Sequence, residues 1–233
     1  MNYTSTIETI TDIARATIAV SWKRPESFLF KAGQSIDMTL LQMPTPDKYG
    51  ATRSFSIVSA PNEKNITVAM RVRDSSFKQK LDKKPTDQKI SWEGPYGGMT
   101  LPDDTTRPLV FFAGGIGITP FMSMLREIVL QKTNHRVILF YSNRTRADAA
   151  FFEELTEIAR THSHITFICT FTQTDQNSHG RIDEKMIREH TRDLEDSKFF
   201  LAGPPRFTTS IKNILIGMSV PRTSILNEVF DGY

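Results

Sequence analysis

The sequence predicts two domains of different fold class, an antiparallel six-stranded β-barrel followed by an α/β domain with a five-stranded parallel sheet. Two observations support this division. Up to about residue 102, short segments of alternating polarity are separated by turn residues, and only residues 75–81 have helical spacing. From Arg107 onward, apolar strand-like segments alternate with segments of helical period, which indicates a parallel sheet with helices on both faces.

The barrel prediction rests on six short segments that alternate in polarity between turn residues. They are residues 6–13, 16–21, 34–41, 52–59, 66–72 and 89–93. The stretch LPDDTTRP at 101–108 is polar and flanked by prolines, as expected for a linker. We therefore predict a domain of residues 1–103 and a second of residues 104–233.

Five strand-like segments begin near Leu109, Arg136, Ile165, Lys198 and Ser224. The first leads into AGGIGITP at 113–120, where glycines interrupt the apolar run before helical spacing resumes after Pro120. With Thr119 as a candidate N-cap, backbone N–H groups and the positive helix end would converge on one point, which suits a phosphate. The alternative is a tight strand-to-helix turn. Because open parallel sheets bind ligands beyond the carboxyl ends of their strands, we expect a ligand between the two domains.

Composition narrows the function classes. The chain has 233 residues, 39% of them hydrophobic, and a net charge of +3 that is too mild and dispersed to suggest nucleic acid. No signal peptide and no apolar run of about 18 residues is visible, so we expect a soluble cytoplasmic protein without a membrane span. Its histidines are scattered, so we expect no metal site. The single cysteine, Cys169, excludes an internal disulfide and a cysteine-ligated iron–sulfur cluster, and its setting FICTFT favours a buried apolar role over a reactive thiol.

Within the barrel, the stretch Arg53-Ser54-Phe55-Ser56 combines three useful chemistries. An arginine can hold a phosphate through several donors, an aromatic ring can lie on a planar ring, and a small hydroxyl can bond a ring heteroatom. In a regular strand, Arg53 and Phe55 project to one face and Ser56 to the other. The alternative is an edge strand with an exposed arginine.

Six motifs in order give the chain a resemblance to a known family. They are FKAGQ (30–34), RSFS (53–56), WEGPYGG (92–98), AGGIGITP (113–120), FLAGPP (200–205) and NEVFDGY (227–233). Together they resemble the ferredoxin–NADP reductase superfamily of flavoprotein electron transferases, over nearly the whole chain. The stretch FYSNRTRADAAFFEEL at 140–155 is most similar to the branch that contains the phthalate dioxygenase, cytochrome b5 and nitrate reductase flavin modules.

The resemblance implies a flavin site in the barrel. Arg53 would hold the flavin phosphate, with Ser54 beside it, Phe55 would pack on the isoalloxazine, and Ser56 would bond near N5 or O4. The ribityl, phosphate and adenine parts would be flanked by Met70, Arg71, Val72, Ser75 and Ser76. Helix capping explains the last two serines equally well. Phe55 stands where the family usually has tyrosine, so stacking would persist without a phenolic hydrogen bond.

The resemblance also implies a nicotinamide site in the second domain. Gly114, Gly115, Gly117 and Thr119 would receive the pyrophosphate, and Gly203, Pro204 and Pro205 would border the nicotinamide, unless the latter form only a strand-to-helix turn. Ala202 replaces the cysteine that the family commonly places there. Ser56 and Glu228 are the candidates for tuning hydride transfer, although Glu228 could be merely solvated. Phe230 and Tyr233 are candidate aromatic covers of the flavin, or packing residues.

Residues 142–146 close the second parallel strand without an acid, and Thr172 stands about where NADH-specific relatives carry aspartate. Arg144 could then accommodate the extra phosphate of NADPH, or it could be a solvated residue like Arg146. The family uses both nicotinamides with this pattern. We therefore expect NADPH or NADH as co-substrate, with a lean to NADPH.

The implied function is a flavin-dependent NAD(P)H oxidoreductase that passes electrons through FAD, or FMN, to a separate acceptor. Ferredoxin, flavodoxin, a haem protein or a subunit of a larger complex would qualify, and we expect a monomer or weak oligomer. The basic residues Lys78, Lys80, Lys83 and Lys84 could contact an acidic partner or form a solvated face. The alternatives are a reductase of free flavin, ferric complexes or quinone, and a nonredox flavin- or nucleotide-binding regulatory module.

Overall fold

A computed structural model describes residues 2–43, 47–48, 50–85, 87–173, 180–191 and 193–230. The chain forms two compact units, Met1–Leu101 with Thr119–Glu127, and Pro102–Ile118 with Ile128–Tyr233. The predicted boundary assigned every residue after 103 to the second domain. The structure instead adds the first part of helix α2 (Thr119–Gln131) to the first unit.

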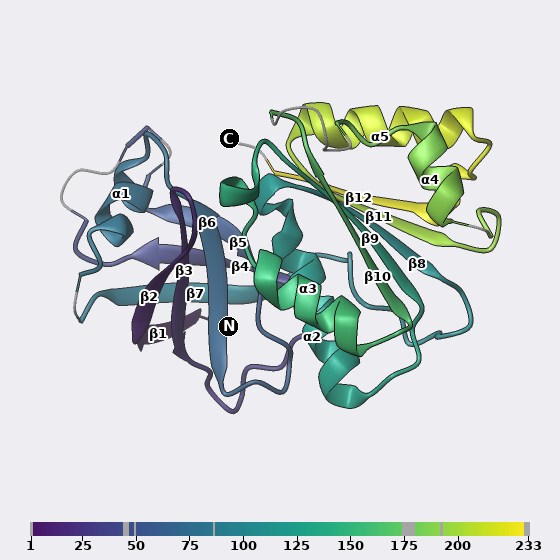
Figure 1. Ribbon diagram of the computed structural model, residues 1–233. Coiled ribbons are helices and arrows are strands. Elements are labelled where there is room, and N and C mark those ends of the chain that lie inside the picture. Colours follow the sequence, from purple (N-terminus) through teal and green to yellow (C-terminus); the bar gives the residue numbers. More distant parts are fainter. Residues whose placement is uncertain are drawn as a thin grey trace. The chain divides into compact units, whose positions relative to one another are not determined.

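The first unit contains two antiparallel sheets (Figure 1). Its strands are β1 (Asn2–Thr6), β2 (Thr9–Ala14), β3 (Thr17–Lys23), β4 (Ser35–Leu40), β5 (Thr52–Ser56), β6 (Asn65–Arg71) and β7 (Lys89–Tyr96). One sheet has the order β1-β7-β4-β5 and the other the order β2-β3-β6. The antiparallel class is confirmed, whereas the single six-stranded barrel is not, because seven strands divide between two sheets that do not close.

The extra strand is β1, which the six predicted segments leave out except for Thr6. The predicted segment 6–13 corresponds to β2, and the chain changes sheets just before β2: the Ile7 amide donates to the Gln88 carbonyl, and the Glu8 amide donates to the Ser21 carbonyl. Polarity alternation reports which face is buried but not which strand is the neighbour. The sequence pattern therefore missed β1.

Aromatic side chains fill the core of the first unit. The Trp92 ring lies 4.7 Å from that of Phe28, edge to face, and 4.6 Å from that of Tyr3. Trp92 also donates through Nε1 to the Ser5 hydroxyl at 3.0 Å, so a polar atom brought into the core keeps a partner. The short helix α1 (Ser76–Asp82) packs Phe77 and Leu81 into the same core.

Helix α2 closes another part of the first unit. The Ser123 hydroxyl donates to the Ser59 carbonyl at 2.7 Å, and both residues are fully buried. A Cβ at Gly33, whose φ is +101°, would lie 2.4 Å from Met124 Cε. Arg126 extends to Glu63 at 3.8 Å. Met124 of α2 therefore occupies the space that a side chain at position 33 would need.

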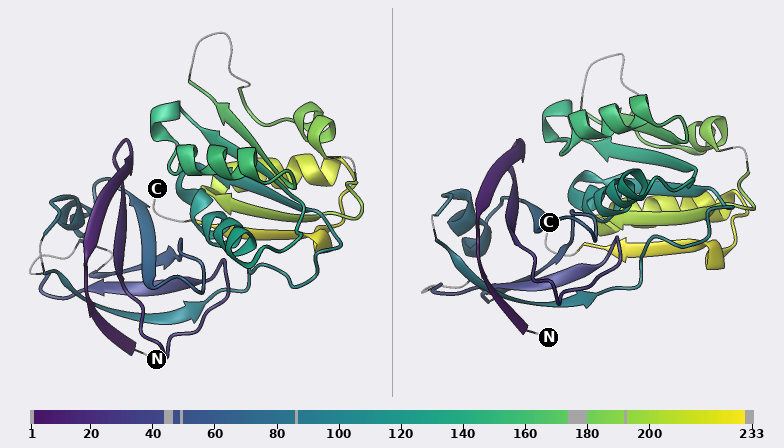
Figure 2. Two further views of the ribbon diagram at one scale, coloured as in Figure 1. Left: turned by 60° about the horizontal axis from the view of Figure 1, so that its bottom comes forward. Right: turned by 90° about the horizontal axis from the view of Figure 1, so that it is seen from below.

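The second unit is built on a sheet of five parallel strands with helices on both faces (Figure 1, Figure 2). The strands are β8 (Leu109–Gly114), β9 (Val137–Asn143), β10 (Ile165–Phe171), β11 (Lys198–Gly203) and β12 (Ile225–Val229), in the order β10-β9-β8-β11-β12. All five predicted strands are confirmed. The inner strands β8, β9 and β11 are mostly apolar, because strands inside a parallel sheet are buried on both faces.

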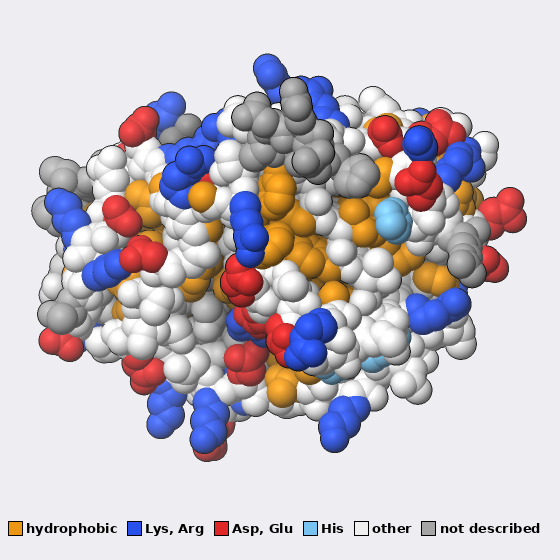
Figure 3. Space-filling model, in the orientation of Figure 1, with side chains coloured by type: hydrophobic (Ala, Val, Ile, Leu, Met, Phe, Trp, Pro, Cys, Tyr) orange, Lys and Arg blue, Asp and Glu red, His pale blue; other side chains and the backbone are white. Residues whose placement is uncertain are grey.

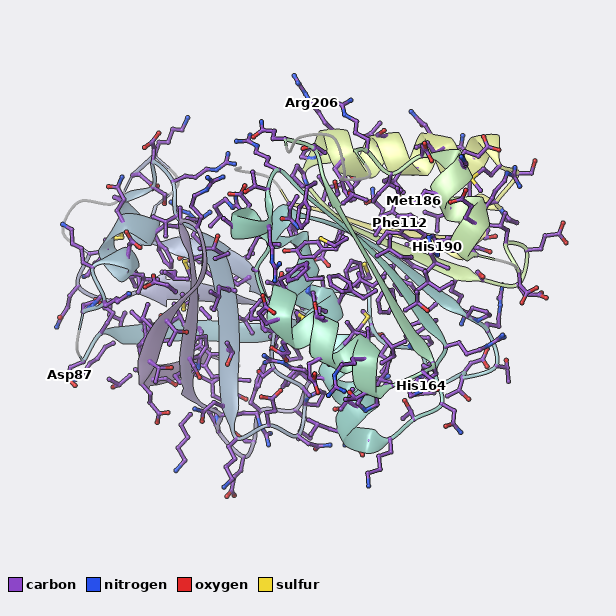
Figure 4. All side chains as sticks on the ribbon, viewed as in Figure 1. Asp87, Phe112, His164, Met186, His190 and Arg206 are labelled. Atoms are coloured by element: carbon purple, nitrogen blue, oxygen red, sulfur yellow. The ribbon has the colours of Figure 1, made fainter. Side chains whose placement is uncertain are left out.

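Helices α3 (Phe152–Thr161), α4 (Glu184–His190) and α5 (Pro205–Gly217) cover this sheet. Phe152 of α3 meets Phe167 of β10 at 5.7 Å. The other core cluster joins α4 and α5 to the sheet, and Figure 4 shows Met186 of α4 close to Phe112 of β8. Short 3₁₀ turns η1 (Gly115–Ile118), η2 (Arg146–Asp148) and η3 (Arg222–Ser224) complete the connections.

None of the helices among the described residues has the length and apolar character that a membrane crossing requires.

Candidate functional site

The order of the parallel strands identifies a candidate ligand site at the carboxyl ends of two central strands. From β8 the chain builds outward through β9 and β10, and it then returns to the other side for β11 and β12. In open α/β sheets, ligands bind beyond the carboxyl ends of the strands where this direction reverses. In this sheet the reversal lies between β8 and β11, which end at Gly114 and Gly203.

Glycines at this point allow close packing of the backbone. A Cβ at Gly117 would lie 2.2 Å from the Ala202 carbonyl oxygen, and a Cβ at Gly203 would lie 3.0 Å from the Gly114 carbonyl oxygen. A Cβ at Gly114 would come within 2.7 Å of the Phe207 ring. These three glycines are therefore required for packing between β8, η1, β11 and α5, whatever else they bind.

Gly115 differs from the other glycines of the turn. Its φ is +54°, in the left-handed region, and no atom of the described residues lies within 4 Å of the position of a Cβ. The backbone here borders open space, which an anion needs to approach main-chain N–H groups. We name Gly114, Gly115, Gly117 and Gly203 the glycine corner.

The helix after the glycine corner begins differently from our prediction. Thr119 was expected to be the N-cap, but Gly115–Ile118 form a 3₁₀ turn that continues into α2, so Ile118 occupies the cap position and no side chain caps the helix. Pro120 lies in the first turn as predicted, where a missing N–H leaves no bond unmade. Thr119 is 3% exposed, and its proposed contact with a pyrophosphate stays a prediction.

The segment after β11 forms a strand-to-helix turn that also fixes the C-terminal strand. The Pro204 carbonyl accepts from the amides of Phe207 and Thr208 at 2.9 and 3.1 Å, and α5 starts at Pro205. The Gly203 carbonyl accepts from the Phe230 amide at 3.0 Å. Phe230 is thereby held beside the glycine corner, whereas Tyr233 lies outside the described residues.

Glu228 reaches the same edge of the sheet. It is paired in register with Ala202 on β11, one residue before Gly203. Its side chain is partly buried, and burial raises the pKa of Glu228 from 4.5 to about 7. This burial does not fit a fully solvated carboxylate, and a catalytic role of Glu228 stays a prediction.

Arg144 lies exposed just beyond the end of β9, where its carbonyl accepts from the Gln173 amide at 2.9 Å. Thr172 donates to the Asn143 carbonyl through its amide and its hydroxyl. These residues therefore lie together at the carboxyl ends of β9 and β10.

Two charged residues just after β9, Arg146 and Asp148, contact residues close to them in the sequence. Arg146 pairs with Glu153 at 2.8 Å and lies over the Phe152 ring at 4.6 Å, so it is exposed but not simply solvated. Asp148 is 3% exposed, and its carboxylate accepts from the Thr145 hydroxyl at 2.7 Å and the Thr145 amide at 3.1 Å. The Asp148 carboxylate is therefore used to close the turn that begins at Thr145.

In the first unit, the RSFS stretch occupies β5, at the edge of its sheet. The alternative interpretation expected an edge strand with an exposed arginine. The edge strand is found, but the Arg53 side chain is only 15% exposed. Arg53 donates to the carbonyls of Gly50 and Thr52 at 2.9 and 2.7 Å, and to Asp47 and Ser75. Ser54 is exposed and donates to Asp37 on β4.

The two faces of β5 carry the side chains as predicted. Arg53 and Phe55 share one face, because the guanidinium carbon lies 5.4 Å from the Phe77 ring centre and the Phe55 ring lies 5.9 Å from it. Phe55 is 8% exposed, so its ring packs mainly in the core. Ser56 is 6% exposed, and its Oγ has no hydrogen-bond partner among the described residues. A buried hydroxyl without a partner fits a ligand that supplies a heteroatom.

The second predicted flavin stretch lies on the strand that faces β5. An isolated antiparallel bridge joins Ile57 to Val68, and the described ladders do not continue it between β5 and β6. In that register, Phe55 would oppose Met70 and Arg53 would oppose Val72. Met70 is 2% exposed and belongs to the core, so any flavin contact there falls to Arg71 and Val72 or to the backbone.

Ser75 and Ser76 do not cap α1 through their side chains. Ser75 occupies the N-cap position, but its hydroxyl donates to Asp47 at 3.0 Å instead of accepting from the helix. The Ser76 Oγ is buried without a partner in the described part of the chain. The capping explanation is therefore wrong for both side chains, and both hydroxyls remain candidates for ligand binding.

Comparison with known proteins agrees with this architecture. Residues 111–213 match the family model of the oxidoreductase NAD-binding domain. The reductase component of propane 2-monooxygenase from Mycolicibacterium smegmatis is 27% identical over 216 residues, which cover 88% of this chain and 60% of that protein. The flavohem-like FAD/NAD binding domain of nitric oxide dioxygenase from Vibrio cholerae superposes with a TM-score of 0.85 at 17% identity, covering 97% of this chain and 98% of that one.

A crystal structure of a ferredoxin NADP⁺ reductase from Neisseria gonorrhoeae with bound FAD and NADP superposes with a TM-score of 0.79 at 21% identity, and the match covers 98% of both chains. The chain has a ferredoxin–NADP reductase-like fold. This confirms the resemblance predicted from the six motifs. The chain spans 60% of the length of the propane monooxygenase component and as little as 34% of other curated relatives.

Sequence reasoning missed or misjudged some residues of the candidate sites. Asp47 binds Arg53 and Ser75 but lies in a proline-rich loop without periodicity. Phe207, which packs where Gly114 lacks a Cβ, gives only a generic helical signal. Lys78 was noted only for a partner surface, although burial and then Arg53 lower its pKa. Each belongs to a contact between distant segments.

Three further expectations from the sequence concern the surface charge, the single cysteine and metal binding. Lys, Arg, Asp and Glu side chains are interspersed on the face in Figure 3, in keeping with a mild net charge. Cys169 is half-buried on β10, and burial raises its pKa to about 12, which keeps the thiol protonated near neutral pH. In the described ranges, no cluster of His, Cys, Asp and Glu is arranged to hold a metal ion.

Proposed function

We propose that this protein is an NAD(P)H-dependent flavoprotein reductase that passes electrons through FAD to a separate acceptor. The observation that carries the proposal is the layout of RSFS on β5. The Arg53 guanidinium lies beside the Ser75 hydroxyl and near Lys78, with the Asp47 carboxylate as its present anionic partner, while the Ser56 hydroxyl, on the opposite face, is buried without a described partner. An anion and a heteroatom acceptor are the two features that a flavin nucleotide supplies.

The bound flavin would supply a ring that accepts a hydride from nicotinamide and releases electrons onward. The protein's part is to bind and orient it. Arg53, Ser75 and Ser76 would hold the phosphate, the Ser56 hydroxyl would donate to the ring near N5 or O4, and Phe55 would support the ring from the core. FAD is preferred over FMN because FAD is named for both similar solved structures.

At the glycine corner, the open backbone at Gly115 would accept the pyrophosphate of the nicotinamide dinucleotide. Gly203, Pro204 and Pro205 would border the nicotinamide, with Phe230 held beside them. Glu228 would hold or release a proton close to the reacting groups, because its pKa lies at about 7. Ser56 and Glu228 are thus the proposed catalytic residues.

The acceptor is proposed by analogy with the relatives. The propane monooxygenase protein is a reductase component, so electrons there go to other components. A ferredoxin, a flavodoxin or a haem protein would serve this chain. A cytoplasmic location, a monomeric or weakly oligomeric state and the lack of nucleic-acid binding stay predictions.

Purified protein tests the function directly. A yellow sample whose flavin absorbance is bleached by NADPH or NADH without oxygen, and which then reduces a dye, is the expected result. Protein that binds flavin but is not bleached by either nicotinamide would point to a regulatory flavin-binding module. Efficient turnover with free flavin, ferric complexes or quinone, but with no protein acceptor, would point to a small-molecule reductase.

Nicotinamide preference is tested at the end of β9. Arg144→Ala should raise the KM for NADPH several-fold and leave that for NADH unchanged, because only NADPH carries the additional phosphate. Arg146→Ala is the matched control, since Arg146 is engaged by Glu153 and Phe152. Equal effects of Arg144→Ala on both nicotinamides would remove the lean to NADPH.

A further inference from the structure

The guanidinium assigned to the flavin phosphate is held by a carboxylate of the chain itself. Arg53 Nη2 donates to Asp47 Oδ1 at 2.5 Å, and the Ser75 hydroxyl donates to Asp47 Oδ2 at 3.0 Å. Arg53 and Ser75 are also within 3.4 Å of each other. The two oxygens of one carboxylate thus take the two donors that would otherwise bind two oxygens of a phosphate.

This ion pair is largely withdrawn from water. The side chains of Arg53 and Asp47 are 15% and 18% exposed, unlike the surface pair of Lys84 and Asp12, at 46% and 65%. The Phe77 ring supports the guanidinium from one side. A charge pair in such a place is screened less than a surface pair, and a lone guanidinium there would be costly. Arg53 therefore needs an anionic partner at all times.

Further cationic side chains lie near this ion pair. The pKa of Lys78 is lowered, first by burial and then by the charges of Arg53 and Arg73, and Asp47 acts in the opposite direction. The charges of two arginines thus act on Lys78. Such surroundings favour an anion with more than one negative charge.

We propose that Asp47 is an internal substitute for the flavin phosphate, which occupies Arg53 and Ser75 until flavin arrives and must leave them when it binds. The proposal rests on the proposed flavin role of Arg53. It makes Asp47 a residue that sets flavin affinity without touching flavin. The apparent affinity is reduced by the fraction of apoprotein in which Asp47 has released Arg53.

The direct test compares flavin binding to the apoproteins of wild type and Asp47→Asn. The amide keeps the size and one acceptor oxygen of the carboxylate but not its charge, so FAD should bind on the order of tenfold more tightly. Asp12→Asn removes the same charge from a surface pair and should change the dissociation constant by less than about twofold. Unchanged or weaker binding in Asp47→Asn, or an equal gain in Asp12→Asn, would overturn the proposal.

A second probe separates this proposal from the flavin function. Inorganic pyrophosphate should bind Asp47→Asn more tightly than wild type by calorimetry, and the double variant Arg53→Ala, Asp47→Asn should lose that gain. If pyrophosphate behaves so but no variant binds flavin, the flavin function fails while the role of Asp47 stands. If wild type binds flavin and Asp47→Asn alters neither ligand, the role of Asp47 fails alone. Asp47→Ser serves as the second variant if thermal unfolding shows that Asp47→Asn is misfolded.

Discussion

The two candidate ligand sites differ in the groups that would contact a ligand. In the first unit, β5 and α1 present charged and hydroxyl side chains, and the chain's own Asp47 already engages two of them. In the second unit, the glycine corner presents backbone, and three of its four glycines are fixed by contacts with Ala202, Phe207 and each other. A side-chain site can be occupied by a competing side chain, whereas a backbone site is shaped by packing before any ligand binds.

The difference determines how each site should respond to mutation. Changes at the glycine corner should divide sharply between folding defects and binding defects, depending on what a new Cβ would meet. Changes at β5 should leave the fold largely intact and alter flavin binding, because Arg53 and Ser56 lie on an edge strand.

The largest expected effect is at Gly117. Gly117→Ala places a methyl group 2.2 Å from the Ala202 carbonyl and should lower the free energy of unfolding by about 3 kcal/mol. Gly115→Ala meets open space and should cost only about 1 kcal/mol, from the left-handed φ. Urea denaturation measures both. Similar losses of unfolding free energy in the two variants would show that Gly117 and Gly115 do not differ in the space around them.

The open glycine can then be tested for ligand binding. Gly115→Val should raise the KM for nicotinamide while leaving the flavin content intact, because the bulk enters the space proposed for the pyrophosphate. Steady-state kinetics with flavin absorbance on the same samples provides the measurement. Unchanged kinetics would remove the loop from the site.

Arg53→Ala should weaken flavin retention by about 3 kcal/mol, or about a hundredfold, by removing the main charged donors to the phosphate. The ratio of flavin to protein after gel filtration measures the loss. Arg160→Ala is the control, since Arg160 forms only an exposed pair with Glu157. Full flavin stoichiometry in Arg53→Ala would count against the assigned role.

Ser56→Ala should have opposite effects on folding and function. Because the Ser56 hydroxyl is buried without a described partner, its removal should leave apoprotein stability unchanged or raise it by up to about 1 kcal/mol. Hydride transfer, followed by stopped-flow bleaching of the flavin, should slow by about tenfold, the value of one hydrogen bond. Ser54→Ala, on the exposed face, should change neither quantity.

The effect at Glu228 differs from the others because it depends on pH. The folded pKa of about 7 lies above the ordinary 4.5, so the favourable contribution is complete below pH 4.5 and is lost as pH rises to about 7. Relative to wild type, Glu228→Gln should therefore gain stability over pH 4.5 to 7 and level off above it. The variant should also lose any activity transition near pH 7. A constant stability difference across this range would show that Glu228 is solvated.

The sequence predicted the parallel sheet more accurately than the antiparallel part. Strands such as Leu109–Gly114 are buried on both faces, so their apolar runs stand out in the sequence. In the antiparallel part, Thr6 and Thr9 belong to strands of different sheets, yet nothing in the alternation between them marks the change. Pairing between distant segments is a tertiary property.

The candidate site shows the same limit. The motifs made Arg53, Ser56 and Gly115 candidates because the chemistry expected of them is tied to residue type. They did not identify Asp47, six positions before Arg53, because its role arises only when the loop folds back onto β5 and α1. The motifs also could not assign Gly117 to packing and Gly115 to open space, since the two differ only in their surroundings.

The shared helix α2 has a practical consequence for anyone who wishes to isolate the antiparallel half. A fragment that stops at Leu101 would lack Ser123, Met124 and Arg126, which satisfy the Ser59 carbonyl, cover Gly33 and reach Glu63. Such a truncation would bare an apolar surface and an unbonded carbonyl, and it should aggregate on expression. Appending residues 119–127 through a flexible tether is the simplest repair, because this nine-residue piece restores all three contacts.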